Sequence, residues 1–334
     1  MSNELVSIII PVYNRADYLE ECLGSIRGQT WKELEVIVID DGSTDRSSEI
    51  IQKYVRLDSR FHLFTTEHKG PSGARNKGID AATGTFLTFV DADDFIGRDY
   101  VRNMAEAIGD SDFCIAGYQV WDQEQNKRRT IKPVSGSFTL TEMGKNIFRY
   151  ESVLRGVAWK LVRRSVVTEH KLFFPPEVRY AEDTLFYFKY LSCIETFVVI
   201  RDAQYVYRKH NQESLVKTSY QEITLIEAFF KELEKLYIEA PQINLRNLIA
   251  CWQVLNLWEF GRCACYRTRG FQKRKRLFYE IVRRYDIKRK CRQVRCISVP
   301  CSAVRLTVLS NTFLPFNLFI RAAGRVMQWD KQFV

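Results

Sequence analysis

The first hundred residues alternate between short β-branched runs and segments with helical spacing, and this alternation limits the fold more than any other feature. Strands separated by helices of about ten residues form a mostly parallel sheet that carries helices on both faces. The sequence therefore predicts an α/β fold. The expected strands are residues 6–12, 35–39, 61–65 and 85–90, and the expected helices are residues 17–26, 45–55 and 72–82.

Three of the predicted strands run directly into polar clusters. Tyr13 and Asn14 follow the first strand, residues 40–43 (DDGS) follow the second, and residues 91–94 (DADD) follow the fourth. In open α/β sheets, ligands bind outside the carboxyl ends of the strands. We therefore expect the three clusters to converge on one ligand site.

The residue types in these clusters suggest a nucleotide diphosphate. No GxGxxG follows the first strand and no GxxxxGK[ST] is present, so the usual glycine-rich phosphate loops are absent. A diphosphate surrounded by carboxylates needs a divalent cation, and oxygen ligands spaced as Asp91-x-Asp93 suit Mg²⁺ or Mn²⁺. Asp40 and Asp41 are able to accept hydrogen bonds from a base or a ribose.

Seven ordered motifs between about residues 5 and 215 resemble family 2 glycosyltransferases, which are metal-dependent enzymes of the Rossmann-like GT-A fold that use nucleotide-sugar donors. No part of the chain after residue 220 takes part in the resemblance. The motifs are SIIIPVYN, VIVIDDGSTD, GPSGARNKGI, FVDADD, WKLVRRSVV, RYAEDTLF and YRKHNQES.

The resemblance implies a role for individual residues. Asp183 matches the general base, and Asp93, together with Asp91 and His210, matches the metal site, although Asp94 leaves the identity of the main metal ligand open. An inverting transfer is an in-line displacement, so one carboxylate takes the acceptor proton on the face opposite the leaving diphosphate. The nucleotide- and donor-binding positions are Pro11, Tyr13, Asn14, Asp41, Arg75 and Asp91.

Each motif also has a structural alternative. Residues 91–94 could cap the following helix, residues 40–45 could form a turn and a helix cap, and Glu182 with Asp183 could favour a helix start. His210 could be a solvated loop residue. Two other functions also remain open: a non-catalytic nucleotide-sugar or glycan-binding module of the same fold, and a nucleotidyltransferase.

The sequence suggests three regions. Residues 1–100 form the nucleotide-sugar-binding half of the α/β domain, and residues 101–215 form its acceptor and catalytic half. Residues 216–334 are expected to be an α-helical, strongly basic extension, because a 3.6-residue period starts near position 221.

The net charge of +10 is unevenly distributed along the chain. Residues 261–334 contain 18 Lys and Arg against 3 Asp and Glu, a net charge of +15, which leaves −5 for residues 1–260. The basic region could be a docked helix pair with a solvated face, or residues 262–295 could bind an anionic membrane. No nucleic-acid motif accompanies the charge, so we expect no nucleic-acid partner.

The remaining features concern the compartment. The nine cysteines are scattered without a CxxC pair, which favours reduced thiols. We find no signal peptide and no run of 18 apolar residues, so we expect a cytoplasmic protein or one peripheral to the inner face of the plasma membrane. The sequence leaves its oligomeric state open.

The whole sequence is best explained as an inverting glycosyltransferase that depends on Mn²⁺ or Mg²⁺. It would move a sugar from a nucleotide-diphosphate donor, expected to be a UDP-sugar, to a hydroxyl of a glycan or lipid-linked glycan. The expected product is a bacterial surface polysaccharide. The donor sugar, the acceptor and the linkage depend on side chains that the sequence does not place.

Overall fold

A computed structural model provides the structure of the protein and divides the chain into two compact units. The first consists of residues 1–177 and 181–212, and the second of residues 178–180 and 213–334. The structure describes residues 4–140, 142, 151–209, 223–240, 246, 249–250, 252–254, 256, 270–293 and 308–309.

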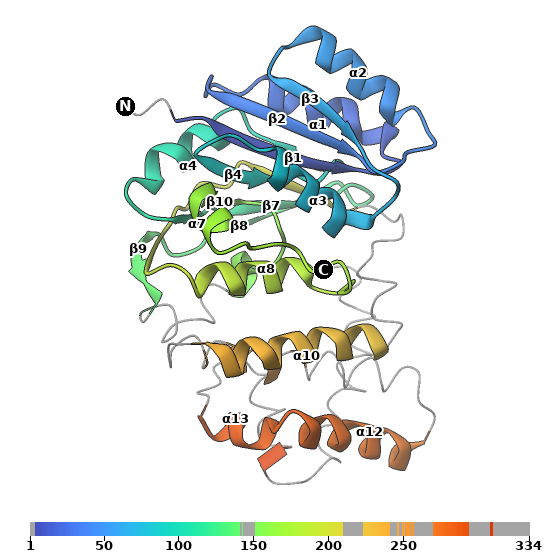
Figure 1. Ribbon diagram of the computed structural model, residues 1–334, viewed down its shortest axis with the longest axis vertical. Helices are drawn as coiled ribbons and strands as arrows, with labels where there is room; N and C mark the ends of the chain where they lie inside the picture. The colour runs from blue at the N-terminus through green and yellow to red at the C-terminus, as the bar shows by residue number, and fades with distance from the viewer. Residues whose placement is uncertain are drawn as a thin grey trace. The chain divides into compact units, whose positions relative to one another are not determined.

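The four strands predicted in the first hundred residues are confirmed, and they pair with one another in parallel. They form one half of an eight-stranded sheet in the order β3-β2-β1-β4 (Figure 1). The central strand β1 is buried on both sides, because Ile8, Ile9 and Ile10 are all 0% exposed. The bounds are β1 Val6–Val12, β2 Leu34–Asp40, β3 Phe61–Thr65 and β4 Phe86–Phe89.

The three predicted helices connect these strands. They are α1 (Ala16–Arg27), α2 (Ser47–Leu57) and α3 (Gly70–Ala81). The chain moves outward from β1 to β3 and then returns to β4, so right-handed crossovers place α1 and α2 on one face of the sheet and α3 on the other (Figure 1). Helix α3 packs on β1 and β2.

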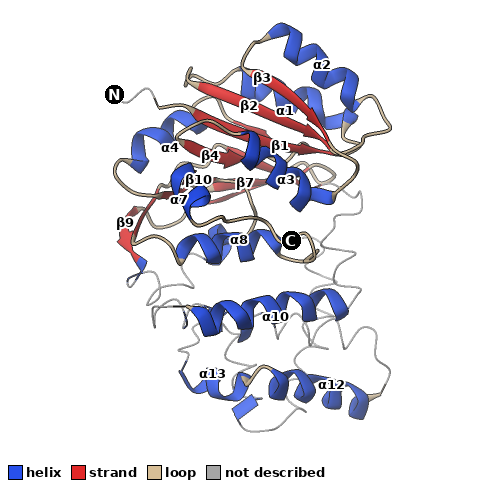
Figure 2. Ribbon diagram, viewed as in Figure 1, coloured by secondary structure: helices blue, strands red, loops and turns tan. Residues whose placement is uncertain are grey.

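The other half of the large sheet is mixed, so the expectation of a mostly parallel sheet holds best for the first half. The order continues β4-β10-β6-β11-β9, in which only β6 and β11 are parallel. Figure 2 labels β4, β10 and β9 of this half. The strands are β6 Phe113–Ile115, β9 Gly136–Thr139, β10 Lys160–Arg163 and β11 Thr196–Val199. The helices of this part are α4 Tyr100–Ile108, α6 Glu151–Leu154, α7 Arg164–Glu169 and α8 Glu182–Leu191.

A second, four-stranded sheet has the order β5-β12-β7-β8. Strands β7 and β8 form an antiparallel hairpin whose turn lies within the polar residues 122–129. Strand β12 pairs with β5, which follows the acidic residues 91–94, and this pairing brings a distant part of the chain beside them. The strands are β5 Phe95–Ile96, β7 Tyr118–Asp122, β8 Lys127–Ile131 and β12 Tyr205–Lys209.

The described part of the second unit is helical, with α10 (Ile223–Glu239), α12 (Phe271–Arg284) and α13 (Ile287–Gln293). The apolar face predicted for α10 is buried at Phe229, Phe230 and Leu233. Among the described residues, no helix has the length and hydropathy needed to cross a membrane. The helix predicted at 141–150 and the apolar segments 245–260, 297–308 and 313–320 lie wholly or mostly outside the described residues.

Candidate active site

The polar clusters after β1, β2 and β4 meet at one edge of the sheet. Because β1 pairs in parallel with both β2 and β4, the carboxyl ends of the three strands lie next to one another. The backbone links the ends directly: Asp41 N donates to Val12 O at 2.8 Å, and Val90 N donates to Ile9 O at 3.1 Å. The structure therefore brings the three clusters together, as the sequence suggested.

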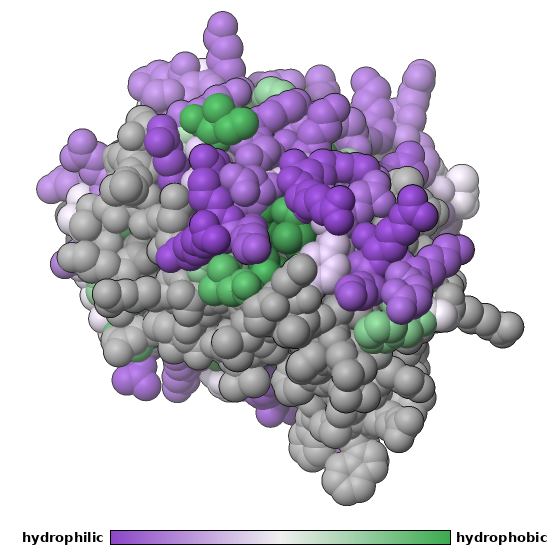
Figure 3. All heavy atoms as spheres, turned by 90° about the horizontal axis from the view of Figure 1, so that it is seen from below, coloured by the Kyte–Doolittle hydropathy of each residue, from purple (hydrophilic) through white to green (hydrophobic). Residues whose placement is uncertain are grey.

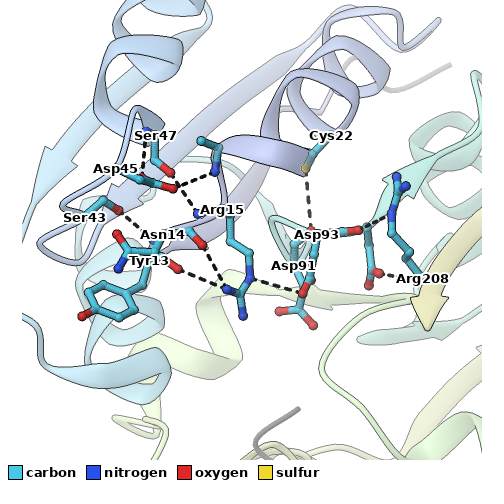
Figure 4. Close-up of polar contacts among 12 residues, drawn as sticks. Tyr13, Asn14, Arg15, Cys22, Ser43, Asp45, Ser47, Asp91, Asp93 and Arg208 are labelled. Carbon is cyan, nitrogen blue, oxygen red and sulfur yellow. Dashed lines mark hydrogen bonds and ion pairs between the residues drawn. The ribbon is translucent and has the colours of Figure 1, made fainter. Parts of the chain in front are cut away.

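Asn14 shapes the loop that follows β2 (Figure 4). Its backbone is left-handed, with φ of 49°, and its Oδ1 accepts a hydrogen bond from Thr44 N at 2.8 Å. Asp45 accepts bonds from Ser47 N at 2.9 Å and Ala16 N at 3.0 Å, so it serves the first turns of α2 and α1 together. Asn14, predicted to bind the donor, thus has a structural role. Asp45 bonds the first residue of α2 from one position before the N-cap, which is Arg46 and has no side-chain cap bond.

Asp41 is 2% exposed and binds the loop that leads into α3. Its carboxylate accepts hydrogen bonds from Lys69 N at 2.7 Å, Gly70 N at 2.8 Å and the Thr66 hydroxyl. The same loop carries His68, whose ring lies 4.0 Å from the ring of Tyr13 between centroids. Tyr13 is 40% exposed, so this pair of rings forms an accessible aromatic wall at the site.

Arg75 connects two carboxylates from different elements. Its side chain is only 8% exposed, and its two terminal nitrogens lie 3.0 Å from Asp91 Oδ1 and 3.0 Å from Glu182 Oε1. Its guanidinium carbon also lies 5.5 Å from the centre of the Phe174 ring. Arg75 therefore ties the acidic turn after β4 to the start of α8, where Asp183 is located.

The pKa values in this cluster reflect burial and close charges. Burial opposes the charge of Arg75, but Asp91, Glu182 and Asp183 raise its pKa above the ordinary value. Burial also raises the pKa of Asp91, opposed by Arg75 and reinforced by Asp93. Burial and the charge of Asp183 raise the pKa of Glu182. One buried cation therefore faces several carboxylates, leaving net negative charge that a further cation would neutralise.

The acidic turn 91–94 divides its carboxylates between the interior and the site. Asp94 is 1% exposed, and its two oxygens accept bonds from the Tyr205 hydroxyl at 2.6 Å and Arg208 N at 2.7 Å. The side chain of Asp93 is 22% exposed and lies 3.3 Å from Arg15 Nε. The side chain of Asp91 is 33% exposed. Asp91 and Asp93 are therefore the solvent-accessible pair, while both carboxylate oxygens of Asp94 form hydrogen bonds inside the protein.

The accessible pair has the chemistry of a divalent cation site. Carboxylate oxygens are the donors that Mg²⁺ and Mn²⁺ prefer, and Mg²⁺ in particular is often bound by one or two carboxylates with water and substrate phosphates. In the described part of the chain, no group of three or more His, Cys, Asp and Glu side chains is placed to hold a metal. His210, the third predicted ligand, lies outside the described residues. Asp91 and Asp93 thus fit a cation that is shared with a diphosphate.

Asp183 lies in the first turn of α8, after Ala181 in a left-handed conformation with φ of 53°. Its Oδ1 accepts a hydrogen bond from Thr184 N at 2.6 Å.

Lys160 is a fully buried cation whose charge interacts with that of Asp183. Its Nζ donates to three backbone carbonyls, at 2.7 Å to Gly156, at 3.2 Å to Arg155 and at 3.3 Å to Ala158. Burial lowers the pKa of Lys160 to about 7, against the opposing charge of Asp183.

Pro11 lies near the end of β1 opposite Ile39, as expected for a residue at the strand edge of the site. The structure also brings here several residues that had no predicted role. Arg15 directly follows the motif that ends at Asn14, and His68 lies two residues before the motif that begins at Gly70, so both positions were a usable signal. Arg208 belongs to the motif YRKHNQES, but its contacts and those of Tyr205 could not be predicted, because they depend on a strand that pairs more than a hundred residues away.

The parallel half-sheet with carboxylates at its strand ends, followed by a mixed half, defines a GT-A fold. Comparison with solved structures agrees. Staphylococcus aureus TarS 1-349, crystallised with UDP-GlcNAc, matches 91% of this chain and 86% of its own with a TM-score of 0.68 at 23% identity. A mannosyltransferase from Pyrobaculum calidifontis, PcManGT, in complex with GDP-Man and Mn²⁺, has a TM-score of 0.55 at 18% identity and matches 99% of this chain and 89% of its own.

Comparison of sequences identifies the family of one domain. The sequence model of glycosyl transferase family 2 matches residues 7–170, and this segment of the chain is a domain of that family. EpsH of Bacillus subtilis strain 168 is 34% identical over 63% of this chain and 62% of its own length. EpsJ of the same strain, an uncharacterized glycosyltransferase, is 32% identical over 65% of this chain and 64% of its own. The chain thus spans less than two thirds of these relatives.

Proposed function

We propose that the protein is an inverting, metal-dependent glycosyltransferase that uses a UDP-sugar and a glycan or lipid-linked glycan acceptor. The observation that carries the proposal is the bridge formed by Arg75. It joins Asp91, which belongs to the predicted metal pair, to Glu182, the neighbour of the predicted base, at 3.0 Å on each side. Donor-side and acceptor-side carboxylates are thereby held in one connected cluster.

The chain's own residues divide the work of the transfer. Tyr13 and His68 offer ring faces to the base of the donor, and Asp91 and Asp93 hold the cation that accompanies the diphosphate. A bound Mn²⁺ or Mg²⁺ neutralises the diphosphate and stabilises charge on the departing nucleotide. Asp183 accepts the proton of the acceptor hydroxyl as the new glycosidic bond forms, and Arg75 keeps the adjacent carboxylate in place.

The two alternative functions have less support. A binding module without catalysis needs neither a metal pair nor a base, yet Asp93 and Asp183 are both present. A nucleotidyltransferase is expected to carry a glycine-rich loop with a basic residue after its first strand, where this chain has PVYNRADY. The similarity to named glycosyltransferases adds to the preference for sugar transfer.

The proposal is tested by measuring the thermal stability of the full chain with a panel of nucleotide sugars and Mn²⁺. A ligand present at about 100 times its Kd stabilises the folded state by about 2.7 kcal/mol, which raises the Tm by several degrees. We expect this rise with UDP-sugars, and its loss in EDTA or in Asp93→Ala. The absence of stabilisation by every nucleotide sugar would reject the proposal.

We further propose that the helix pair α12–α13 binds an anionic membrane surface. One side of the pair is packed, with Phe278, Val282, Tyr285 and Ile287 all under 10% exposed. Most described residues on the face seen in Figure 3 are hydrophilic. Each cation near an anionic bilayer adds about 1 kcal/mol of attraction. Among the side chains of the pair that the structure describes, the exposed cations are Lys273, Arg276, Arg283, Arg284, Lys288, Arg289 and Arg292.

Sedimentation with vesicles that contain anionic lipid tests this second proposal. The double change Arg283→Glu and Lys288→Glu should reduce the bound fraction sharply, because it replaces two exposed cations by anions. The matched control is Lys127→Glu with Arg129→Glu, two exposed cations of β8 in the other unit. Equal loss in both double variants would point to net charge alone and contradict a specific surface.

A further inference from the structure

The turn that carries Asp91 and Asp93 is held from its inner side by β12. Asp94 N closes the turn by donating to Asp91 O at 3.0 Å. The Tyr205 hydroxyl accepts from Asp91 N at 3.2 Å and donates to Asp94 Oδ2 at 2.6 Å. Arg208 N donates to Asp94 Oδ1 at 2.7 Å. The residues of β12 thus hold the turn through hydrogen bonds to the buried carboxylate of Asp94.

Arg208 adds a contact to the residue that faces the site (Figure 4). Its Nε donates to the backbone carbonyl of Asp93 at 2.9 Å, and its terminal nitrogen forms an ion pair with Glu21 of α1. The contact to Asp93 fixes the peptide plane between Asp93 and Asp94. That plane is part of the backbone from which the Asp93 side chain projects, so Arg208 restrains the position from which this carboxylate reaches the site.

The guanidinium of Arg208 is itself tightly enclosed. The residue is 5% exposed, and its guanidinium carbon lies 5.0 to 5.4 Å from the ring centres of Tyr18, Phe95 and Trp121. A planar, delocalised cation is suited to such an aromatic enclosure, whereas a lysine ammonium has neither the shape nor the fork of donors. Enclosure by α1, β5 and β7 leaves Arg208 little freedom, so its bond to Asp93 is a rigid one.

We propose that Arg208 is a positioning residue that presents the Asp93 carboxylate to the cation and diphosphate of the donor. It acts through Asp93 and contacts neither substrate nor metal. The inference rests on the proposed function, since it assigns Asp93 to the cation. It adds that affinity for the cation depends on a residue of β12 that is 115 positions away in the sequence.

The test measures Mn²⁺ binding to the full chain by electron paramagnetic resonance of free Mn²⁺ in the presence of UDP. Arg208→Met should weaken Mn²⁺ binding about 10- to 100-fold, the usual loss when a residue that orients a metal ligand is removed. Arg208→Lys should recover only part of this loss. Glu21→Gln should lose less than Arg208→Met, because it leaves the bond from Arg208 Nε to Asp93 in place.

Arg128→Met is the matched control. Arg128 is an exposed cation whose guanidinium lies 4.9 Å from the ring centre of Trp121, so its removal disturbs the same ring without touching the turn. We expect wild-type Mn²⁺ affinity in this variant. Equal weakening in Arg128→Met and Arg208→Met would overturn the positioning role, because a general loss of packing around Trp121 would then explain both.

The outcomes separate this inference from the proposed function. If the wild-type protein binds Mn²⁺ with UDP and a folded Arg208→Met does so equally well, only the role of Arg208 is rejected. If Arg208→Met does not fold, Arg208→Lys decides, and wild-type Mn²⁺ affinity in that variant rejects the role. If the wild-type protein itself fails to bind Mn²⁺ with UDP, the proposed function fails and the inference fails with it.

Discussion

At the scale of single residues, the site consists of carboxylates with unequal surroundings. Asp94 is almost fully buried and bonded on both oxygens, whereas Asp91 and Asp93 keep 33% and 22% of their side chains exposed. Glu182 is held by Arg75 and begins α8, and Asp183 follows it in the first turn of that helix. Neighbouring acidic residues therefore differ in exposure and in hydrogen bonding, so the buried ones stabilise the fold and the exposed ones are accessible to a ligand.

Asp183→Asn tests the assignment of the base. The amide keeps the size of the side chain but cannot take up the acceptor proton, so kcat should fall about 10²- to 10⁴-fold. Binding of UDP with Mn²⁺ should stay close to wild type, because Asp183 is not in the predicted metal pair. Turnover and UDP affinity are measured on the same preparation, and unchanged turnover would remove Asp183 from this role.

Lys160 makes stability depend on pH in an alkaline window. Its pKa is lowered to about 7 in the folded protein from 10.5, so between these values the unfolded chain binds more protons. The free energy of unfolding should therefore rise as pH increases from about 7 to 10, by at most about 1.4 kcal/mol per pH unit. Urea unfolding of wild type and Lys160→Met measures this, and an identical slope in both contradicts the assignment.

At the scale of secondary-structure elements, the placement of α3 decides where Arg75 lies. Gly78 is buried on α3 against β1, and a Cβ at this position would lie 2.3 Å from Ile9 Cγ2. The close approach of the helix to the strand requires glycine. Arg75 lies on the same helix three residues earlier, so the distance between α3 and β1 also sets its reach toward Asp91 and Glu182.

Gly78→Ala should destabilise the protein although alanine favours helices by about 1 kcal/mol. Forcing a methyl group into a packed interface costs about 1–3 kcal/mol or more, so we expect a net loss of about 1–2 kcal/mol in urea unfolding and weaker UDP binding. Gly24→Ala in α1 is the control, since its Cβ would meet Tyr54 Oη at 3.3 Å. A loss of equal size in the control would contradict the steric explanation.

At the scale of the whole molecule, negative and positive net charge lie in different parts of the chain. Residues 1–260 carry a net charge of −5 and contain the acidic turn, while residues 261–334 carry +15. In the proposed function, the acidic part would meet an anionic donor through a cation held at Asp91 and Asp93. The basic part is available for an anionic surface, and in the proposed arrangement neither task depends on the net charge of +10.

Salt should weaken the proposed binding to anionic vesicles much more than the proposed Mn²⁺-dependent binding of UDP. The screening length falls from about 10 Å at 0.1 M to about 3 Å at 1 M ionic strength, so attraction of exposed cations to a charged surface weakens steeply. Between about 0.05 and 0.5 M NaCl we expect vesicle binding to be lost and Mn²⁺-dependent UDP binding to change much less. A parallel loss of both would contradict this division.

Much of the fold was predictable because its signals are local. The β-branched runs of β1 to β4 and the helices between them follow the hydrophobic periodicity. The convergence of Tyr13, Asp41 and Asp91 followed from the rule that parallel strands end at the same edge. The order of the later strands was not predictable, because β10 and β11 pair with partners that are distant in sequence.

The sequence by itself determined the α/β pattern, the acidic strand ends and the family, because each depends on residue types at short spacing. Only the tertiary structure decided that Asp94 is turned inward, that Asp41 binds the loop before α3, and that Arg208 reaches the carbonyl of Asp93. The physical reason is that a run of four residues offers three equivalent carboxylates. Their difference arises when β12 pairs beside the turn and supplies the donors that take one of them into the interior.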